Sequence, residues 1–111
     1  MNTKTFLTPD AATFERDVLQ REGTVLVEFW APWCGPCRAL KPIVEAVGSE
    51  RSADDFQVAF VDLDEVPELA ERFGVRSIPA LKLFRDGQLV AERVGSLGKR
   101  ELEDWLDAHA A

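Results

Sequence analysis

Residues 25–37 are the most informative part of the chain for its fold and read Val25-Leu26-Val27-Glu28-Phe29-Trp30-Ala31-Pro32-Trp33-Cys34-Gly35-Pro36-Cys37. Its first six residues are a nearly continuous apolar run of β-branched and aromatic side chains, which is typical of a strand covered on both faces. After the cysteines, apolar residues recur with the spacing of a helix face, at Leu40, Ile43, Val44 and Val47. The stretch therefore predicts a buried strand that leads into a helix, with two cysteines at the junction.

The segments on either side predict further strands and helices in alternation. Residues 3–7 indicate a short edge strand, and a helix follows in which Thr8 is the N-cap and Pro9 takes the first helical position. The apolar face of that helix would use Ala11, Phe14 and Val18. Residues 56–63 predict a second buried strand, and residues 66–73 again have helical spacing.

The last third of the chain predicts a hairpin and a final helix. Two strand-like runs, 80–85 and 89–94, are separated by Asp86-Gly87, a strong indicator of a two-residue hairpin turn. A last helix begins after Gly98. Strands that alternate with helices indicate a parallel sheet, and the hairpin adds an antiparallel edge. The order βαβαβαββα thus predicts an α/β fold with a central five-stranded mixed sheet flanked by four helices.

Length and charge limit the classes of function. The chain has 111 residues, which predicts a single domain over residues 1–111. Its formal net charge of -7 argues against binding to nucleic acid or to an anionic membrane surface. Its first residues do not resemble a signal peptide, and no apolar run approaches the ~18 residues of a membrane span. We therefore expect a cytoplasmic protein, and a monomer.

In the reducing cytosol, two cysteines separated by two residues indicate redox chemistry, because cytosolic disulfides are usually transient and catalytic. Cys34 would lie at a helix N-terminus, where unpaired N–H groups and the helix dipole stabilise a thiolate. Cys37 follows one turn later and can bridge to it. Gly35 allows close approach by a partner backbone, and Pro36 pre-sets a helical φ. The spacing predicts dithiol–disulfide exchange in which Cys34 attacks and Cys37 resolves.

Glu28 is the candidate base for this exchange. It interrupts an otherwise apolar strand, and charged side chains are rarely buried without a reason. Burial would raise the pKa of its carboxyl towards the range in which it can take the proton of Cys37. The alternative is that Glu28 faces a solvated gap or pairs with a lysine.

Other readings of the cysteine pair stay open at this point. A zinc site normally needs four ligands. His109 is the one further ligand that we expect beside the two cysteines, which is too few. We therefore expect no metal and no cofactor. The two cysteines could instead be an inert packed pair, or an oxidant or isomerase pair of another compartment. The domain could also be a binding module in which redox chemistry is incidental.

The chain resembles the thioredoxin family over nearly its whole length. Residues 25–38 are similar to the family's active-site stretch. Further similarities are Pro42 to its kink proline, Arg76-Ser77-Ile78-Pro79-Ala80 to its cis-proline loop, and Asp86-Gly87 and Val94-Gly95 to its hairpin turn and second groove loop. The combination is far more specific than any one of these motifs.

The resemblance implies properties that spacing cannot supply. It implies that the Ile78–Pro79 peptide bond is cis and packs beside the cysteines. It implies that the backbone of a partner binds in a groove and pairs there with the loop before Pro79. The groove would be formed by Trp33, Gly35, Pro36, Ile78, Pro79, Val94 and Gly95. It also implies disulfide-bearing target proteins as substrates and regeneration by a thioredoxin reductase that draws electrons from NADPH.

Two positions depart from the family pattern. Where this chain has Glu28 the family usually has an aspartate, so the carboxylate is displaced by one methylene. Where this chain has Phe60 the family often has a lysine near the buried acid. We therefore expect Glu28 to lack that cationic partner, and its protonated form to be favoured more strongly.

Overall fold

The computed structural model describes residues 6–109. In chain order the elements are a short π-helix η1 (Glu15–Leu19), β1 (Thr24–Trp30), α1 (Gly35–Ser49), β2 (Phe56–Asp62), α2 (Pro67–Arg72), β3 (Ala80–Arg85), β4 (Gln88–Val94) and α3 (Lys99–Ala108). The predicted alternation of strands and helices is confirmed. The hairpin turn and the end of α2 are also where the sequence predicts them, with positive φ at Asp86, Gly87 and Gly74.

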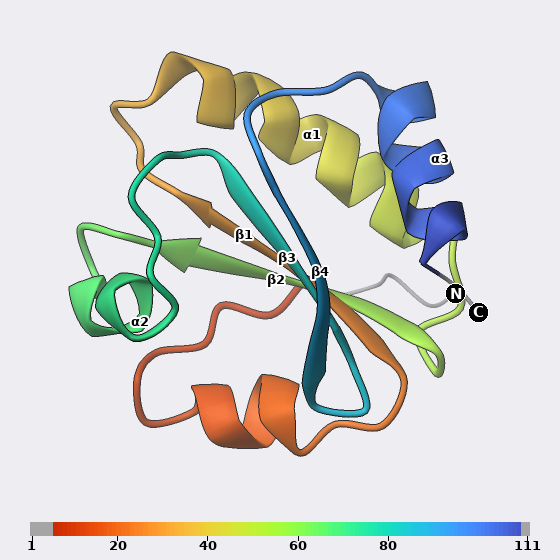
Figure 1. The fold of residues 1–111 in the computed structure, drawn as a ribbon, viewed down its shortest axis with the longest axis horizontal. Helices are drawn as coiled ribbons and strands as arrows, with labels where there is room; N and C mark the ends of the chain where they lie inside the picture. Colours follow the sequence, from red (N-terminus) through yellow and green to blue (C-terminus); the bar gives the residue numbers. More distant parts are fainter. Residues whose placement is uncertain (1–5, 110–111) are drawn as a thin grey trace.

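The sheet has the strand order β2-β1-β3-β4. β1 pairs with β2 in parallel and with β3 antiparallel, and the β3–β4 hairpin completes the other edge. Figure 1 shows three layers, with α1 and α3 on one face of the sheet and η1 and α2 on the other. Because β1 is central, the carboxyl end of that strand opens at the middle of the sheet edge, which is where ligands bind in open α/β sheets.

The described sheet has four strands, not the predicted five. Residues 3–5 of the predicted first strand lie outside the described residues. Leu7 forms an isolated parallel bridge with Ala59, in which its N–H donates to Val58 O and its carbonyl accepts from Phe60 N, each at 2.9 Å. Pairing ends there because Pro9 follows closely and has no N–H to give to a ladder.

The first helix also differs from the expectation. It is the π-helix η1, which begins at Glu15, and no helix begins at Thr8. Asp10, not Thr8, caps the turn that precedes it, because its carboxylate accepts the backbone N–H groups of Ala12 and Thr13 at 2.9 Å. Of the predicted apolar face, Phe14 and Val18 are buried whereas Ala11 is exposed.

The sheet separates two apolar clusters. One fills the space under η1 and α2 and includes three tilted or edge-on aromatic side chains, Phe14, Phe73 and Phe84. The other lies between the sheet and the helices α1 and α3. Its buried residues are Leu26, Leu40, Val44, Val47, Phe56, Val58, Phe60, Leu81, Leu83, Leu97, Leu102 and Leu106. Side chains alternate along β1, so Glu28 faces this second cluster together with Leu26.

Candidate active site

The two cysteines lie at the junction of β1 and α1 and form a disulfide, with their Cα atoms 5.2 Å apart. Cys34 is the N-cap of α1, and its sulfur accepts the backbone N–H of Cys37 at 3.2 Å. Cys37 is fully buried, whereas Cys34 retains 7% of its exposed surface. The predicted placement of both residues is confirmed, and Cys34 is the more accessible of the two.

Gly35 and Pro36, between the cysteines, are exposed and form the first two positions of α1. A side chain added at Gly35 would meet no atom within 4 Å, so open space lies over this residue. The carbonyl of Pro36 accepts a hydrogen bond from the hydroxyl of Ser96 at 3.3 Å. The start of α1 is thereby tied to the loop after β4.

The Ile78–Pro79 loop lies beside the disulfide. Its peptide bond is cis, as the resemblance implied, and the carbonyl oxygen of Ile78 is 4.0 Å from the sulfur of Cys34. The backbone N–H of Gly95 donates to Pro79 O at 2.8 Å and joins this loop to the end of β4. Segments far apart in the sequence are thus held around Cys34 by backbone contacts.

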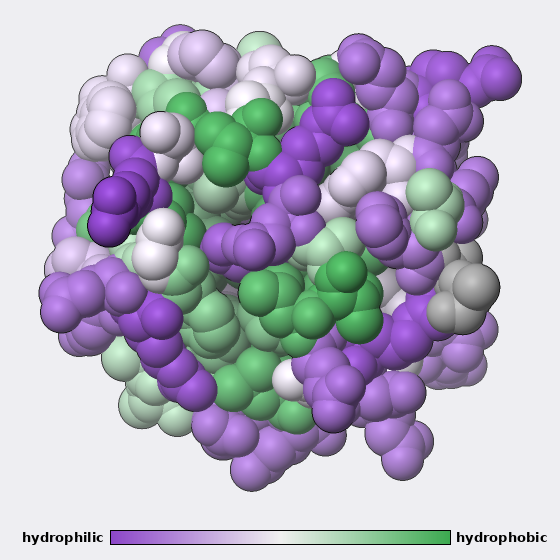
Figure 2. All heavy atoms as spheres, in the orientation of Figure 1, coloured by the Kyte–Doolittle hydropathy of each residue, from purple (hydrophilic) through white to green (hydrophobic). Residues whose placement is uncertain are grey.

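Exposed apolar side chains border the same place. Trp33 is 68% exposed and Val94 is 62% exposed, while Ile78 is half-buried. On the face drawn in Figure 2, hydrophobic surface gathers near the centre, over β4, the strand that ends at Val94. The indole N–H of Trp33 donates to both carboxylate oxygens of Asp64, at 3.1 and 3.2 Å. This bond holds a large ring in place although most of its surface is open to solvent.

Glu28 is fully buried, and neither of its carboxylate oxygens has a hydrogen-bond partner. Burial raises the pKa of this carboxyl to about 8; the ammonium of Lys41 lowers the pKa and the carboxylate of Glu45 raises it. The predicted burial of Glu28 is confirmed, and the alternative of a solvated gap is wrong. Phe60 supplies no cation, as expected, but the ammonium of Lys41 on α1 acts on Glu28 in its place, without a hydrogen bond to either carboxylate oxygen.

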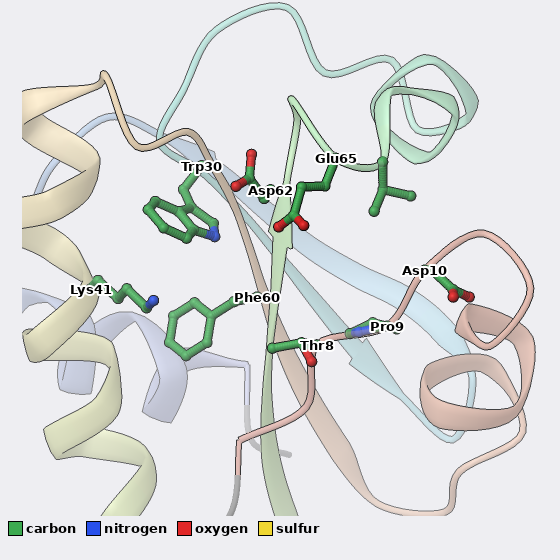
Figure 3. A pocket seen from close by; sticks show the side chains of 9 residues that line it. Thr8, Pro9, Asp10, Trp30, Lys41, Phe60, Asp62 and Glu65 are labelled. Carbon is green, nitrogen blue, oxygen red and sulfur yellow. The ribbon is translucent and has the colours of Figure 1, made fainter.

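A pocket of about 370 Å³ is lined in part by Phe60, the residue opposite Glu28 on β2, and by Trp30, two residues beyond Glu28 on β1. Figure 3 shows Trp30 from β1 and Phe60 from β2 in its wall, with Lys41 reaching towards both rings from α1. The other residues that line the pocket are Thr8, Pro9, Asp10, Asp62, Glu65 and Val66.

Within residues 6–109 no group of three His, Cys, Asp or Glu side chains could hold a metal ion. Among the same residues, every helix is too short or too polar to span a membrane.

Comparison with known proteins agrees with this geometry. The thioredoxin family model matches residues 5–108. The chain is 47% identical to thioredoxin 1 of Synechococcus elongatus over 88% of its length and 91% of that protein. It is 50% identical to a thioredoxin of Mycobacterium bovis over 84% of its length and 83% of that protein. It is 43% identical to a thioredoxin of Rhodospirillum rubrum over 87% of its length and 92% of that protein.

The chain belongs to the thioredoxin family. With its Cys34–Cys37 pair it is a thioredoxin-type dithiol–disulfide oxidoreductase, which acts on disulfides and, as the family implies, has a reductase as its partner. The fold has the α/β architecture expected of a thioredoxin domain, with one strand fewer in the described sheet.

Three residues of this thioredoxin site were not found from the sequence. Asp64 holds Trp33, Ser96 binds the start of α1, and Lys41 acts on Glu28. Asp64 follows the end of a parallel strand, a location that favours functional side chains. Lys41 is four residues after Cys37, which places both on the same side of a helix. The sequence contains no comparable indication for Ser96.

Proposed function

We propose that this thioredoxin reduces disulfides of other proteins, with Cys34 as the attacking thiolate and Cys37 as the resolving thiol. The supporting observation is that the sulfur of Cys34 caps α1 and accepts the N–H of Cys37. When the pair is reduced, the same helix end stabilises negative charge on the Cys34 sulfur.

The electrons move in two exchange steps. The Cys34 thiolate attacks one sulfur of the target disulfide, forming a mixed disulfide and releasing the other target sulfur as a thiolate. Cys37 then gives up its proton and attacks the Cys34 sulfur, which releases the second target thiolate. The target has gained two electrons, and the protein is left with the Cys34–Cys37 disulfide seen in this structure.

Glu28 is our candidate to accept the proton of Cys37. Support comes from its burial without hydrogen-bond partners, which raises its pKa to about 8. With that pKa the carboxyl is partly ionised at neutral pH, and its ionised fraction can take a proton from a buried thiol.

The target would bind in an extended form across the groove around Cys34. Its backbone would pair with the loop before Pro79, where the Ile78 carbonyl lies 4.0 Å from the Cys34 sulfur. The remaining groove surface would come from Trp33, Gly35, Pro36, Val94 and Gly95. The exposure of Trp33 and Val94 and the open space over Gly35 support this assignment.

Regeneration would come from a thioredoxin reductase that draws electrons from NADPH, and we place the protein in the cytoplasm as a monomer. A pair that must return to the dithiol after each turnover requires a reducing supply, and the cytosol maintains one.

Single cysteine variants test the assignment of roles. Cys34→Ser should abolish reduction of a disulfide-bonded test protein, and Cys37→Ser should accumulate mixed disulfides through Cys34 that are visible by non-reducing electrophoresis. The double serine variant is the control, because it should form none. Undiminished turnover by Cys34→Ser, or mixed disulfides formed through Cys37 in that variant, would overturn the assignment.

A further inference from the structure

The ammonium of Lys41 is held by two aromatic rings. Its nitrogen lies 4.2 Å from the centre of the Trp30 ring and 5.0 Å from the centre of the Phe60 ring. Figure 3 shows the lysine extending from α1 towards these rings, which come from two adjacent strands. Contacts at these distances are favourable cation–π interactions, so the charge has a defined position although the residue is half-buried.

The same two rings are the neighbours of Glu28. Phe60 stands directly opposite Glu28 in the β1–β2 register, and Trp30 is two residues further along β1 on the same face. On α1, Lys41 is one turn beyond Cys37, so the helix presents the thiol and the ammonium on one side. The ammonium is therefore held on two rings that flank the buried acid, and its side chain comes from the helix that carries the thiol.

Competing partners do not remove the ammonium from this position. Asp10, Asp62 and Glu65 line the same pocket, yet Lys41 forms no salt bridge among residues 6–109. Other groups that face Glu28 are few. α1 contributes the carboxylate of Glu45, while the opposite residues on β2 and β3 are the apolar Phe60 and Leu81.

We propose that Lys41 is a positioning residue for proton transfer, whose ammonium, held on Trp30 and Phe60, keeps part of the Glu28 population ionised and so speeds release of the target by Cys37. This rests on the base role proposed for Glu28. The opposite electrostatic effects of Lys41 and Glu45 on the Glu28 carboxyl support it. The family often has a lysine at the position of Phe60. In this chain the Phe60 ring instead contacts the ammonium of Lys41, which comes from α1.

The direction of the effect follows from the charge. Without the ammonium, Glu28 keeps its proton to higher pH, and fewer molecules have an ionised base at pH 7. A charge in direct contact changes a carboxyl's ionisation about tenfold or more, and solvent screens a half-buried one. Because Lys41 is half-buried, we expect less than this tenfold effect. Removing its charge should slow the release of the target by Cys37 at pH 7 about threefold.

The test uses Lys41→Met, which keeps the apolar stem, and Lys41→Arg, which restores the charge. Two quantities are measured over pH 5–10: the rate at which a preformed mixed disulfide is resolved, and the carbon-13 chemical shift of the Glu28 carboxyl. Lys41→Met should move both midpoints to higher pH, and Lys41→Arg should return both towards the parent values. Identical midpoints in the parent and Lys41→Met would overturn the proposal.

Two further variants separate the possible failures. Glu45→Gln removes the opposing negative charge and should move the Glu28 midpoint to lower pH, which keeps the electrostatic argument testable if Lys41→Met folds poorly; an unmoved midpoint would contradict it. In a Glu28→Gln background the effect of Lys41→Met on the release rate should vanish. If Glu28→Gln alone leaves release unchanged, the base role fails, whereas the carboxyl titration still reports on Lys41.

Discussion

Replacing the buried acid by its neutral isostere, Glu28→Gln, should make the protein more stable at neutral pH. A carboxyl with a higher pKa in the folded than in the unfolded protein holds its proton more tightly when folded. Between the unfolded pKa of 4.5 and the folded pKa of about 8, Glu28 is ionised in the unfolded chain but protonated in the folded protein. The contribution of this group to the free energy of unfolding is therefore fully present below pH 4.5 and is lost as the pH rises towards 8.

The magnitude follows from the same two values. Each pH unit in this window costs about 1.4 kcal/mol, and pH 7 lies about 2.5 units above the unfolded pKa, so the parent protein has lost about 3 kcal/mol at pH 7. The glutamine amide is buried without partners much as the protonated carboxyl is, so its own desolvation cost is similar. We expect Glu28→Gln to recover about 2–3 kcal/mol at pH 7 and almost nothing at pH 4.

Urea unfolding of the oxidised protein between pH 4 and pH 8.5 measures this difference, because neither cysteine titrates while the disulfide is intact. Glu22→Gln is the matched control: it removes a carboxylate from an exposed position and should run parallel to the parent over the whole range. A constant difference in unfolding free energy between Glu28→Gln and the parent from pH 4 to pH 8.5 would contradict this prediction, since it would mean that Glu28 ionises equally in the folded and unfolded states.

Two further predictions concern the groove and the hairpin. Asp64→Ala frees the indole of Trp33 and should raise KM for a disulfide-bonded protein about threefold without changing the urea midpoint; an unchanged KM would show that the hydrogen bond does not order the groove. Gly87→Ala would bring a Cβ within 2.1 Å of Leu19 O at φ +83 and should cost about 3 kcal/mol in urea unfolding. Gly74→Ala, at φ +66 with open space, should cost about 1 kcal/mol, and equal losses would contradict the steric argument.

Much of this architecture could be predicted because its causes are local. The apolar run of β1, the helical spacing of α1 and the Asp86-Gly87 turn depend on residues a few positions apart, and each appears where expected. The first segment was predicted less well. Asp10, not Thr8, caps the turn before η1. The pairing of the first segment with β2 stops at Leu7 because Pro9 has no N–H to donate, although strand propensity would extend it.

The order of residues along the chain was enough to predict the cysteine pair and its position. A buried strand that leads directly into a helix, with cysteines three residues apart at the junction, requires only local geometry to place one sulfur at the helix end and the other one turn inside. The burial of Glu28 followed from the same strand, because an acid within a central apolar run has no route to solvent.

The groups that surround the cysteine pair could be identified only from the packed structure. Ile78 reaches Cys34 from 44 residues away, and Asp64 reaches Trp33 from 31 residues away. Lys41 acquires its place beside Glu28 because α1 packs across β1 and β2 and brings the ammonium against two rings from different strands. Such contacts depend on how elements pack, and the order of residues along the chain does not encode them locally.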